Sequence, residues 1–441
     1  MIKVLIAEDI PSHNKGEAAL FYGLKESLRP YADTDVRLFS LNPEIDTPNY
    51  AGDAVVVNAQ GVVPEHILDG YGSTLKKIYN YINFIGKHFA FGVLHKLLKN
   101  KAFWFMRSPV WRAYVEADII LMSHDSFYTP LYHGIQALLF ESLKKQAIIY
   151  AATIKPGVRN RKNIKARILN FWSCFTLKRV KYITLREGQS KTYLADIGVL
   201  NSGTPVTVYP DLAFLVKPIP SEDAWALLET EGIPENRPLV GMAVSQRKLD
   251  FAFPGRKMMN RRKEALAPIV ETVNFLTDKL HATVVFIPHS IGPTEVLDDR
   301  ITAKMIKDKA LSPERIHIVS NEYSSHELKG MAACLDMTIG TRLHFTIDAV
   351  CSAVPSLLIT HDGDFRCHGI IGEMMGMQDY VYNIDNIETG VLINKISSLW
   401  RNREQVAEEL KSRIVKIEKE TYLHGKTAIG LINDIEGGIP S

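Results

Sequence analysis

The sequence lacks the features of a secreted or membrane-spanning protein. It has only 4 cysteines, Cys174, Cys334, Cys351 and Cys367, which stand far apart with no Cys-x-x-Cys pair, so neither a disulfide framework nor a zinc site is expected. No run of about 18 uninterrupted apolar residues occurs, which excludes a spanning helix. The first residues, MIKVLIAEDI, have the pattern of a β-strand rather than of a signal peptide. A cytoplasmic protein is therefore expected.

Acidic residues are missing from two long stretches. Between Gly70 and Val115 there is no Asp or Glu, whereas lysines and arginines alternate with Tyr, Phe and Trp. The run from Lys155 to Lys181 is also free of acid. A basic, aromatic helix of this kind is typical of an anchor that lies in the plane of lipid headgroups. The alternatives are a dimer interface, a packed helical hairpin and, least favoured because no recognised motif accompanies it, a nucleic-acid surface.

Short apolar runs alternate with segments that have the length and spacing of amphipathic helices. This alternation is typical of a parallel sheet that helices cover on both faces. The composition, 46% hydrophobic and 23% charged, is that of a globular protein, and the length favours two domains. The expected strands are Lys3–Ala7, Val36–Leu41, Ala54–Asn58, Ile119–Ser123, Ala147–Ala151, Tyr182–Thr184, Val206–Tyr209, Leu239–Ala243, Thr283–Pro288, Ile316–Ile318, Met337–Ile339 and Ser356–Ile359.

A proline-rich segment, PDLAFLVKPIP, separates the two halves of this pattern. It predicts a boundary near Lys217 between an N-terminal domain (1–217), with a helical insertion over about 70–115, and a C-terminal domain (218–441) whose last helix could pack back on the first. The expected fold class is α/β, with two Rossmann-like doubly wound lobes facing a central cleft. Ligands of such sheets bind at the carboxyl ends of the strands.

Two loops at strand ends could bind ligands. In IPSHNKGEAAL, Asn14, Gly16 and Glu17 open a helix whose free N–H groups would face the cleft, although Asn14 could simply be a helix cap. In IGTRLHFTIDAV, Arg342 and His344 lie at a helix N-terminus after a strand. There the helix dipole, the free N–H groups and the guanidinium all favour an anion, the alternative being a surface arginine beside a capping histidine.

Several segments together resemble one enzyme family. They are NKGEAAL near the start, YITLREGQSKTYLADIGV and VYPDLAF in the middle, and IGTRLHFTIDAVCSAVPSLLI late in the chain. Polysaccharide pyruvyl transferases carry a similar Asn-x-Gly-Asp loop, an Arg-Glu-x-x-Ser segment, a Pro-Asp pair and an Arg-Leu-His-x-x-Ile element. The resemblance spans about residues 1–390. It implies a two-lobed fold like that of GT-B glycosyltransferases, and transfer of a pyruvyl group from phosphoenolpyruvate to a sugar of a cell-surface polysaccharide.

Carried over residue by residue, the resemblance implies that Arg342, Leu343 and His344 bind phosphoenolpyruvate. A further donor-binding arginine of the family follows the first strand of the second lobe. In this chain Ser245 occupies that slot, and Arg247, two residues on, is the expected substitute.

Departures from the family pattern gather on the acceptor side. His124 and Asp125 replace a Gly-Gly turn after DIILMS, Glu17 replaces the usual Asp of the first loop, and only Arg366 lies near the position of a late Lys. These changes predict an unusual acceptor and leave a changed activity open.

The transfer needs cations for a carboxylate and a phosphate, a proton donor for the methylene carbon and a base for the sugar hydroxyl. Arg342 and Arg247 suit the anions, and His344 is the expected proton donor. His289, after another strand, could meet the phosphate.

On the first lobe, Asp125 is the expected base, with His124 or Glu17 as alternates and a turn cap as its structural role. Asp211 is expected to fix the linker rather than to touch substrate. The residues expected to bind the acceptor are Asn14, Gly16, Glu17, His124 and Asp125.

No cofactor beyond the co-substrate phosphoenolpyruvate, and no metal, is expected, since Asp362 and Asp364 lack the other ligands of a calcium loop. The expected acceptor is a saccharide on a polyprenyl diphosphate, met at the inner face of the cytoplasmic membrane. Two other functions stay open. One is a GT-B glycosyltransferase that uses a nucleotide sugar, although no clear acidic ribose-binding residue is present, and the other is a non-catalytic saccharide-binding scaffold.

Overall fold

The computed structural model describes residues 1–64, 74–122, 125, 130–155, 164–292 and 294–436. By their internal contacts the residues form two compact units. Unit 1 contains Met1–Ser12, Leu24–Tyr209 and Tyr422–Ser441, and unit 2 contains His13–Gly23 and Pro210–Thr421.

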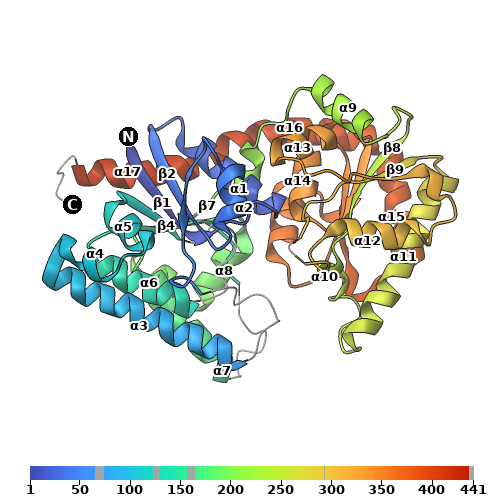
Figure 1. The fold of residues 1–441 in the computed structure, drawn as a ribbon. Coiled ribbons are helices and arrows are strands. Elements are labelled where there is room, and N and C mark those ends of the chain that lie inside the picture. The colour runs from blue at the N-terminus through green and yellow to red at the C-terminus, as the bar shows by residue number, and fades with distance from the viewer. Residues whose placement is uncertain (65–73, 123–124, 126–129, 156–163, 293, 437–441) are drawn as a thin grey trace. The chain divides into compact units, whose positions relative to one another are not determined.

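Unit 1 is built on a seven-stranded parallel sheet in the order β3-β2-β1-β4-β5-β6-β7 (Figure 1). The central strands are buried throughout or nearly so, as parallel strands covered on both faces are. The strands are β1 (Ile2–Asp9), β2 (Thr34–Ser40), β3 (Val55–Asn58), β4 (Ile119–Met122), β5 (Gln146–Ala152), β6 (Ile183–Leu185) and β7 (Val206–Val208). The helices that accompany them are α1 (Lys15–Leu28), whose first part belongs to unit 2, α2 (Pro43–Asn49), α3 (Thr74–Leu98), α4 (Ala102–Phe105), α5 (Pro109–Glu116), α6 (Pro130–Ser142), α7 (Ile164–Leu177), α8 (Gly188–Asp196) and α17 (Leu423–Glu436).

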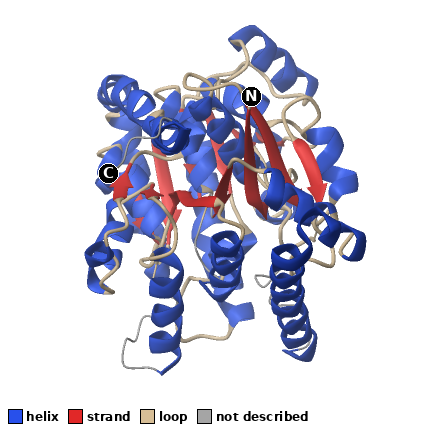
Figure 2. Ribbon diagram, turned by 90° about the vertical axis from the view of Figure 1, so that its left-hand side faces the viewer, coloured by secondary structure: helices blue, strands red, loops and turns tan. Residues whose placement is uncertain are grey.

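Unit 2 repeats this plan with a six-stranded sheet in the order β10-β9-β8-β11-β12-β13. Its strands are β8 (Leu239–Ala243), β9 (Thr283–Phe286), β10 (Ile316–Ile318), β11 (Met337–Gly340), β12 (Ser356–Thr360) and β13 (Val381–Asn383). Its other helices are α9 (Ser221–Thr230), α10 (Gln246–Leu249), α11 (Met258–Asp278), α12 (Asp299–Lys307), α13 (Ser325–Ala333), α14 (Leu343–Cys351), α15 (Thr389–Arg401) and α16 (Arg403–Thr421). In Figure 2, where unit 1 faces the viewer, the strands drawn in red form the inner layer, with helices on both sides.

The predicted α/β fold class and all twelve predicted strands are confirmed, and β13 is the additional strand. In each unit the strand order reverses beside the first strand, between β1 and β4 and between β8 and β11. Doubly wound sheets bind ligands at the carboxyl ends of the strands at this reversal. Each unit therefore offers one such edge.

The linker and the first loop both belong to unit 2, which corrects the expected boundary. The linker turns into a short helix, η3 (Leu212–Leu215), capped by the buried carboxylate of Asp211, and all four of its residues are buried. Because these apolar side chains pack in unit 2, the division falls after Tyr209 rather than near Lys217.

The helical insertion of unit 1 consists of α3, α4 and α5, with α3 packed along α6. No helix in the ranges that the structure describes is long and apolar enough to cross a bilayer. The last helix, α17, belongs to unit 1, where His424 contacts the hydroxyl of Thr184 at 2.8 Å.

Candidate functional site

Arg342 lies at the N-terminus of α14, directly after β11, where Asp299 holds its guanidinium. Its Nε donates to the two carboxylate oxygens at 3.2 and 3.0 Å, and its Nη2 donates to Oδ1 at 2.6 Å. Asp299 is buried and also accepts the backbone N–H groups of His289 and Ser290, which fixes the carboxylate. No described residue accepts from Nη1, and the Arg342 side chain is 21% exposed. The guanidinium thus keeps one donor edge for an anion.

The first turn of α14 adds backbone donors next to Arg342. The helix buries Leu343, Ile347 and Val350 in unit 2, which fixes its direction. Within the described ranges no side-chain cap is present at its N-terminus. Its first N–H groups and the positive end of its dipole therefore favour the same anion as Arg342.

His344 lies on this first turn, against the start of α1. A Cβ atom at Gly16 would lie 2.2 Å from Nδ1 of His344, so only glycine permits the approach. The loop before α1 is held there by its backbone, because Lys15 N–H donates to the carbonyl of His289 at 3.0 Å and Asn14 forms a β-bridge with Ser290.

The first loop lies in a different unit from the one expected, while its binding of the acceptor stays a prediction. Asn14, Gly16 and Glu17 belong to unit 2 with His344, and not to unit 1 with Asp125 as expected. Asn14 Nδ2 donates to Glu17 Oε1 at 2.7 Å, and the Asn14 carbonyl accepts from Ala18 N–H at 3.0 Å, which is the first i to i+4 bond of α1. The sequence missed the pairing of this loop with the segment after β9, which is distant along the chain.

Two further cations share one buried carboxylate at the same sheet edge. Lys248 of α10 contacts Asp364 at 2.5 Å, and Arg366 donates to its two oxygens at 3.1 and 3.3 Å. Burial alone would raise the pKa of Asp364, but Arg366 and Lys248 outweigh burial and hold the pKa well below its ordinary value. The neighbouring Arg247, predicted to bind the donor, has an exposed side chain. Lys248 was not predicted, because its partner follows β12 more than a hundred residues later.

His289 is committed to protein contacts. Its Nε2 contacts Asp348 Oδ2 at 2.9 Å, its Nδ1 contacts the carbonyl of Ile287 at 3.3 Å, and its side chain is buried. Because both ring nitrogens have partners, the geometry does not favour the predicted contact with phosphate. His289 instead orients α14 and donates its backbone N–H to Asp299.

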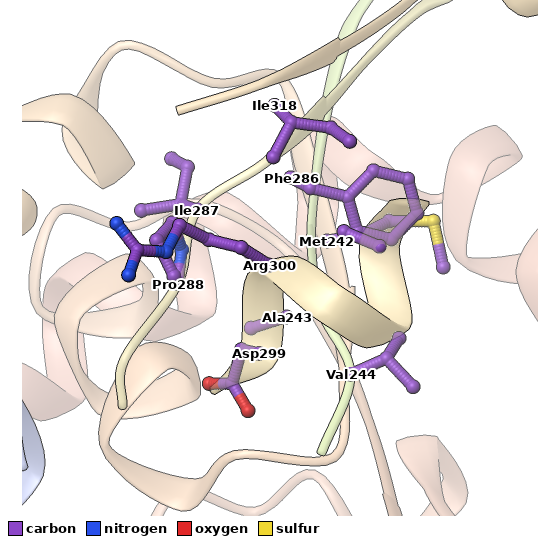
Figure 3. A pocket seen from close by; sticks show the side chains of 10 residues that line it. Met242, Ala243, Val244, Phe286, Ile287, Pro288, Asp299, Arg300 and Ile318 are labelled. Carbon is purple, nitrogen blue, oxygen red and sulfur yellow. The ribbon is translucent and has the colours of Figure 1, made fainter. Parts of the chain in front are cut away.

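A small crevice lies behind Asp299, between α12 and the ends of β8, β9 and β10. Figure 3 shows the Asp299 carboxylate directed away from the apolar side chains of Phe286 and Ile318. The crevice is too tight to admit a water molecule. The other side chains that line the crevice therefore hold Asp299, the partner of Arg342, in place, and the crevice is not the ligand site.

In unit 1, Asp125 follows β4 and is paired with Arg186. The Arg186 guanidinium is fully buried, donates from Nη2 to the Asp125 carbonyl at 2.7 Å and to its carboxylate, and donates from Nε to Thr153 Oγ1 at 3.0 Å. The next residue, Glu187, caps α8 by accepting from Ser190, and burial raises its pKa. Arg186, the first residue of the Arg-Glu-x-x-Ser segment, thus fixes the position of Asp125 at the sheet edge. His124 lies outside the described residues.

Sequence reasoning missed a second carboxylate at this edge. Glu8 is the next-to-last residue of β1 and accepts from Nε2 of His133, on the first turn of α6. The His133 side chain is buried, whereas Glu8 is 17% exposed. Tyr132 beside them donates to the Ala7 carbonyl at 3.3 Å, and burial raises the Tyr132 pKa, so that its hydroxyl stays protonated. Glu8 near the end of β1 and Asp125 in the loop after β4 thus lie at the two strands where the order reverses.

No group of three His, Cys, Asp or Glu side chains in the described part of the chain could hold a metal ion. Independence of metal stays a prediction.

Comparisons with known proteins support the sequence resemblance. Residues 14–363 match the family described as polysaccharide pyruvyl transferase. The amylovoran biosynthesis protein AmsJ of Erwinia amylovora is 22% identical over 332 residues, which are 72% of this chain and 73% of that protein.

Solved structures share the two-lobed fold at low identity. Sucrose-phosphate synthase of Thermosynechococcus elongatus aligns with a TM-score of 0.59 at 11% identity, over 100% of both chains. UDP-GlcNAc 2-epimerase of Neisseria meningitidis aligns with a TM-score of 0.58 at 13% identity, over 98% of this chain and 100% of that one. The fold is GT-B-like, and the match over most of its length shows that this chain belongs to the polysaccharide pyruvyl transferase family.

Proposed function

We propose that this protein transfers a pyruvyl group from phosphoenolpyruvate to a sugar of a cell-surface polysaccharide or of its lipid-linked precursor, forming a cyclic ketal and releasing phosphate. The observation that carries the proposal is the geometry of Arg342. Asp299 engages its Nε and Nη2, and Nη1 remains for an anion beside the uncapped start of α14. Family membership supports a polysaccharide-modifying transferase, and this site supports an anionic donor.

The donor has two anionic groups, and unit 2 has cations for both. Arg342 and the first N–H groups of α14 would bind one of them. Lys248 and Arg366, oriented by Asp364, are the candidates for the other, with Arg247 at the exposed rim. A charge-assisted hydrogen bond contributes about 1.5–3 kcal/mol, so two such contacts would contribute about 3–6 kcal/mol to donor binding.

His344 is proposed as the proton donor. Its imidazolium would protonate the methylene carbon while the first sugar hydroxyl adds to the adjacent carbon and loses its proton to a base. The bond from that carbon to the phosphate oxygen then breaks. The second hydroxyl adds to the same carbon, and its proton leaves with phosphate. The proton that the base took returns to His344 through solvent, so atoms and charge balance over the whole cycle.

The acceptor base is proposed to be a carboxylate of unit 1. Asp125 is the residue expected from the sequence, and Glu8, near the end of the neighbouring strand β1, has a carboxylate that His133 orients. A polyprenyl-diphosphate-linked saccharide at the inner face of the cytoplasmic membrane would suit the acid-free run from Lys155 to Lys181.

Calorimetric titration of phosphoenolpyruvate into wild type and into Arg342→Ala tests the donor. Saturable binding that the substitution abolishes is expected. The matched control is Arg300→Ala, because Arg300 directly follows Asp299 in α12 but is paired with Asp298 and with the Ser320 carbonyl. The control should bind like wild type.

His344→Gln separates binding from chemistry, because it should keep donor affinity while losing ketal formation. Two results would overturn the proposal. Binding of a UDP-sugar in place of phosphoenolpyruvate would assign a nucleotide-sugar transferase. Unchanged cellular polysaccharide in both Arg342→Ala and His344→Gln strains would assign a non-catalytic saccharide-binding scaffold.

A further inference from the structure

Helix α3 has two apolar faces, and within the part of the chain that the structure describes one of them packs against the protein while the other is exposed. On the inner face, Phe91 stacks on Trp111 with ring centroids 4.6 Å apart, and His88 contacts the hydroxyl of Tyr114 at 3.3 Å. The opposite face is exposed although its positions recur at helical spacing. The large side chains of that face are Ile78, Ile82, Phe89, Val93 and Leu97.

Helix α7 repeats the pattern. Ile164, Ile168 and Phe171 recur at i, i+4 and i+7 and are all more than half exposed. Helix α6 packs against both α3 and α7, so the three helices form one layer at the lower edge of unit 1 in Figure 1. Trp104 and Phe105 of α4, which follows α3, are each 69% exposed. More than half of the large apolar side chains that are exposed in the described ranges lie on these four helices.

The same layer is basic. Its α3–α5 part contains no acidic residue before Glu116, and α7 contains none. Exposed cations border the apolar stripes, among them Lys96, Lys99 and Arg107. The one exposed carboxylate on α6, Glu141, is paired with Arg179. Exposed apolar side chains alternate here with cations that have no acidic neighbours on α3 or α7. Such a surface fits an anionic lipid bilayer, which has an apolar interior and negatively charged headgroups.

We propose that α3, α4 and α7 dock this protein on an anionic lipid bilayer, with the helices in the headgroup plane and Trp104 and Phe105 inserted among the acyl chains. A second copy of the chain fits less well. A twofold contact brings identical patches together, so it would place two acid-free cationic surfaces face to face, where they repel each other. The cores of protein interfaces are also depleted of lysine. This inference stands on the helix faces alone and does not depend on the proposed donor chemistry.

Flotation of the full-length protein with vesicles tests the surface. Wild type is expected to float with phosphatidylcholine–phosphatidylglycerol vesicles, to bind pure phosphatidylcholine weakly, and to lose binding as salt rises. The variant Ile82→Glu/Phe89→Glu should lower the bound fraction by roughly tenfold, since two carboxylates would enter the interface. Both side chains are exposed, so the thermal midpoint should stay near that of wild type.

The matched control is Val391→Glu/Val415→Glu, which changes two exposed apolar side chains of unit 2 and should float like wild type. Three results would overturn the proposal. They are no binding to anionic vesicles at low salt, equal binding by the α3 variant, and a concentration-dependent dimer in solution that the α3 variant abolishes. The donor titration is a separate readout, so failure of either experiment leaves the other interpretable.

Discussion

Both units hold an arginine–aspartate pair after a strand at the sheet edge where the strand order reverses, yet the two pairs differ in exposure. In unit 1 the Arg186 guanidinium is fully buried and donates its hydrogen bonds to Asp125 and Thr153. In unit 2 the guanidinium of Arg342 is 21% exposed, while its partner Asp299 is the buried member. Where the acid is buried, the cation remains available for a ligand. Where the cation is buried, the pair fixes the loop.

The two arginine–aspartate pairs are chemically similar but differ in which of their groups remain open to a ligand. Two backbone N–H groups fix the Asp299 carboxylate in place. It therefore orients the Arg342 guanidinium without occupying all of its N–H donors. Asp125 has its carbonyl and its carboxylate engaged by a single arginine. Binding of an anion is therefore expected in unit 2, and positioning of a loop in unit 1.

Removal of the buried cation should have the largest effect. Arg186→Met is expected to lower the free energy of unfolding by about 3–5 kcal/mol, because it leaves Asp125 without its buried partner. Denaturant titration measures this loss. The control Arg179→Met changes an exposed arginine paired with Glu141 and should cost less than about 1 kcal/mol. Equal losses in the two variants would contradict the distinction between the pairs.

Neutralising Glu8 tests which carboxylate of unit 1 acts as the base. Glu8→Gln is expected to lower kcat roughly 100-fold with an unchanged KM for phosphoenolpyruvate, because proton transfer from the hydroxyl is lost. Steady-state assays of phosphate release with a saccharide acceptor measure both constants. Asp125→Asn should act mainly on stability and on acceptor KM. A kcat loss confined to Asp125→Asn would return the role of base to Asp125.

Exchange of the exposed guanidinium should affect binding rather than folding. Arg342→Lys keeps a charge beside Asp299 but cannot offer a fork of donors to a ligand. Loss of about 2 kcal/mol, or roughly 30-fold in donor affinity, is expected by calorimetry, with a thermal midpoint close to that of wild type. A large fall in the thermal midpoint of Arg342→Lys without a change in donor affinity would show that the Arg342–Asp299 pair has a structural role, like the Arg186–Asp125 pair of unit 1.

The smallest effect is expected from acid pH on the buried carboxylate of Asp364. Its pKa in the folded protein is depressed, so the unfolded chain binds the proton more readily between the depressed value and the ordinary value of about 3.9. The stability that Asp364 contributes is thus complete above the ordinary pKa and is lost as pH falls below it. The difference in unfolding free energy between wild type and Asp364→Asn should shrink between pH of about 5 and about 3. A constant difference would show that the charge of Asp364 is not what stabilises the edge.

The layout of the sheets could be predicted because each strand is a short apolar run with a turn signal on both sides. β13 (Val381–Asn383) was not predicted, although in length and burial it is similar to β7 and β10, which were. The start of unit 2 was misplaced because the apolar run of η3 could belong to either neighbour until its packing was known.

The site could be predicted only where its residues are close in sequence. Arg342, Leu343 and His344 form one segment with a helix start, so their position at a strand end was readable. The partners Asp299, Asp364 and His133 lie far along the chain from Arg342, Lys248 and Glu8. No local pattern reports such pairs, because a sheet of reversed strand order brings distant loops to one edge.

The contact between Gly16 and His344 links two positions more than three hundred residues apart. A side chain at position 16 would collide with the imidazole, so any lineage that replaces this glycine must first move or give up the histidine. The two positions should therefore be kept or lost together among relatives. A sequence that keeps one without the other marks a descendant whose chemistry has drifted, which gives a simple way to sort such genes before any protein is made.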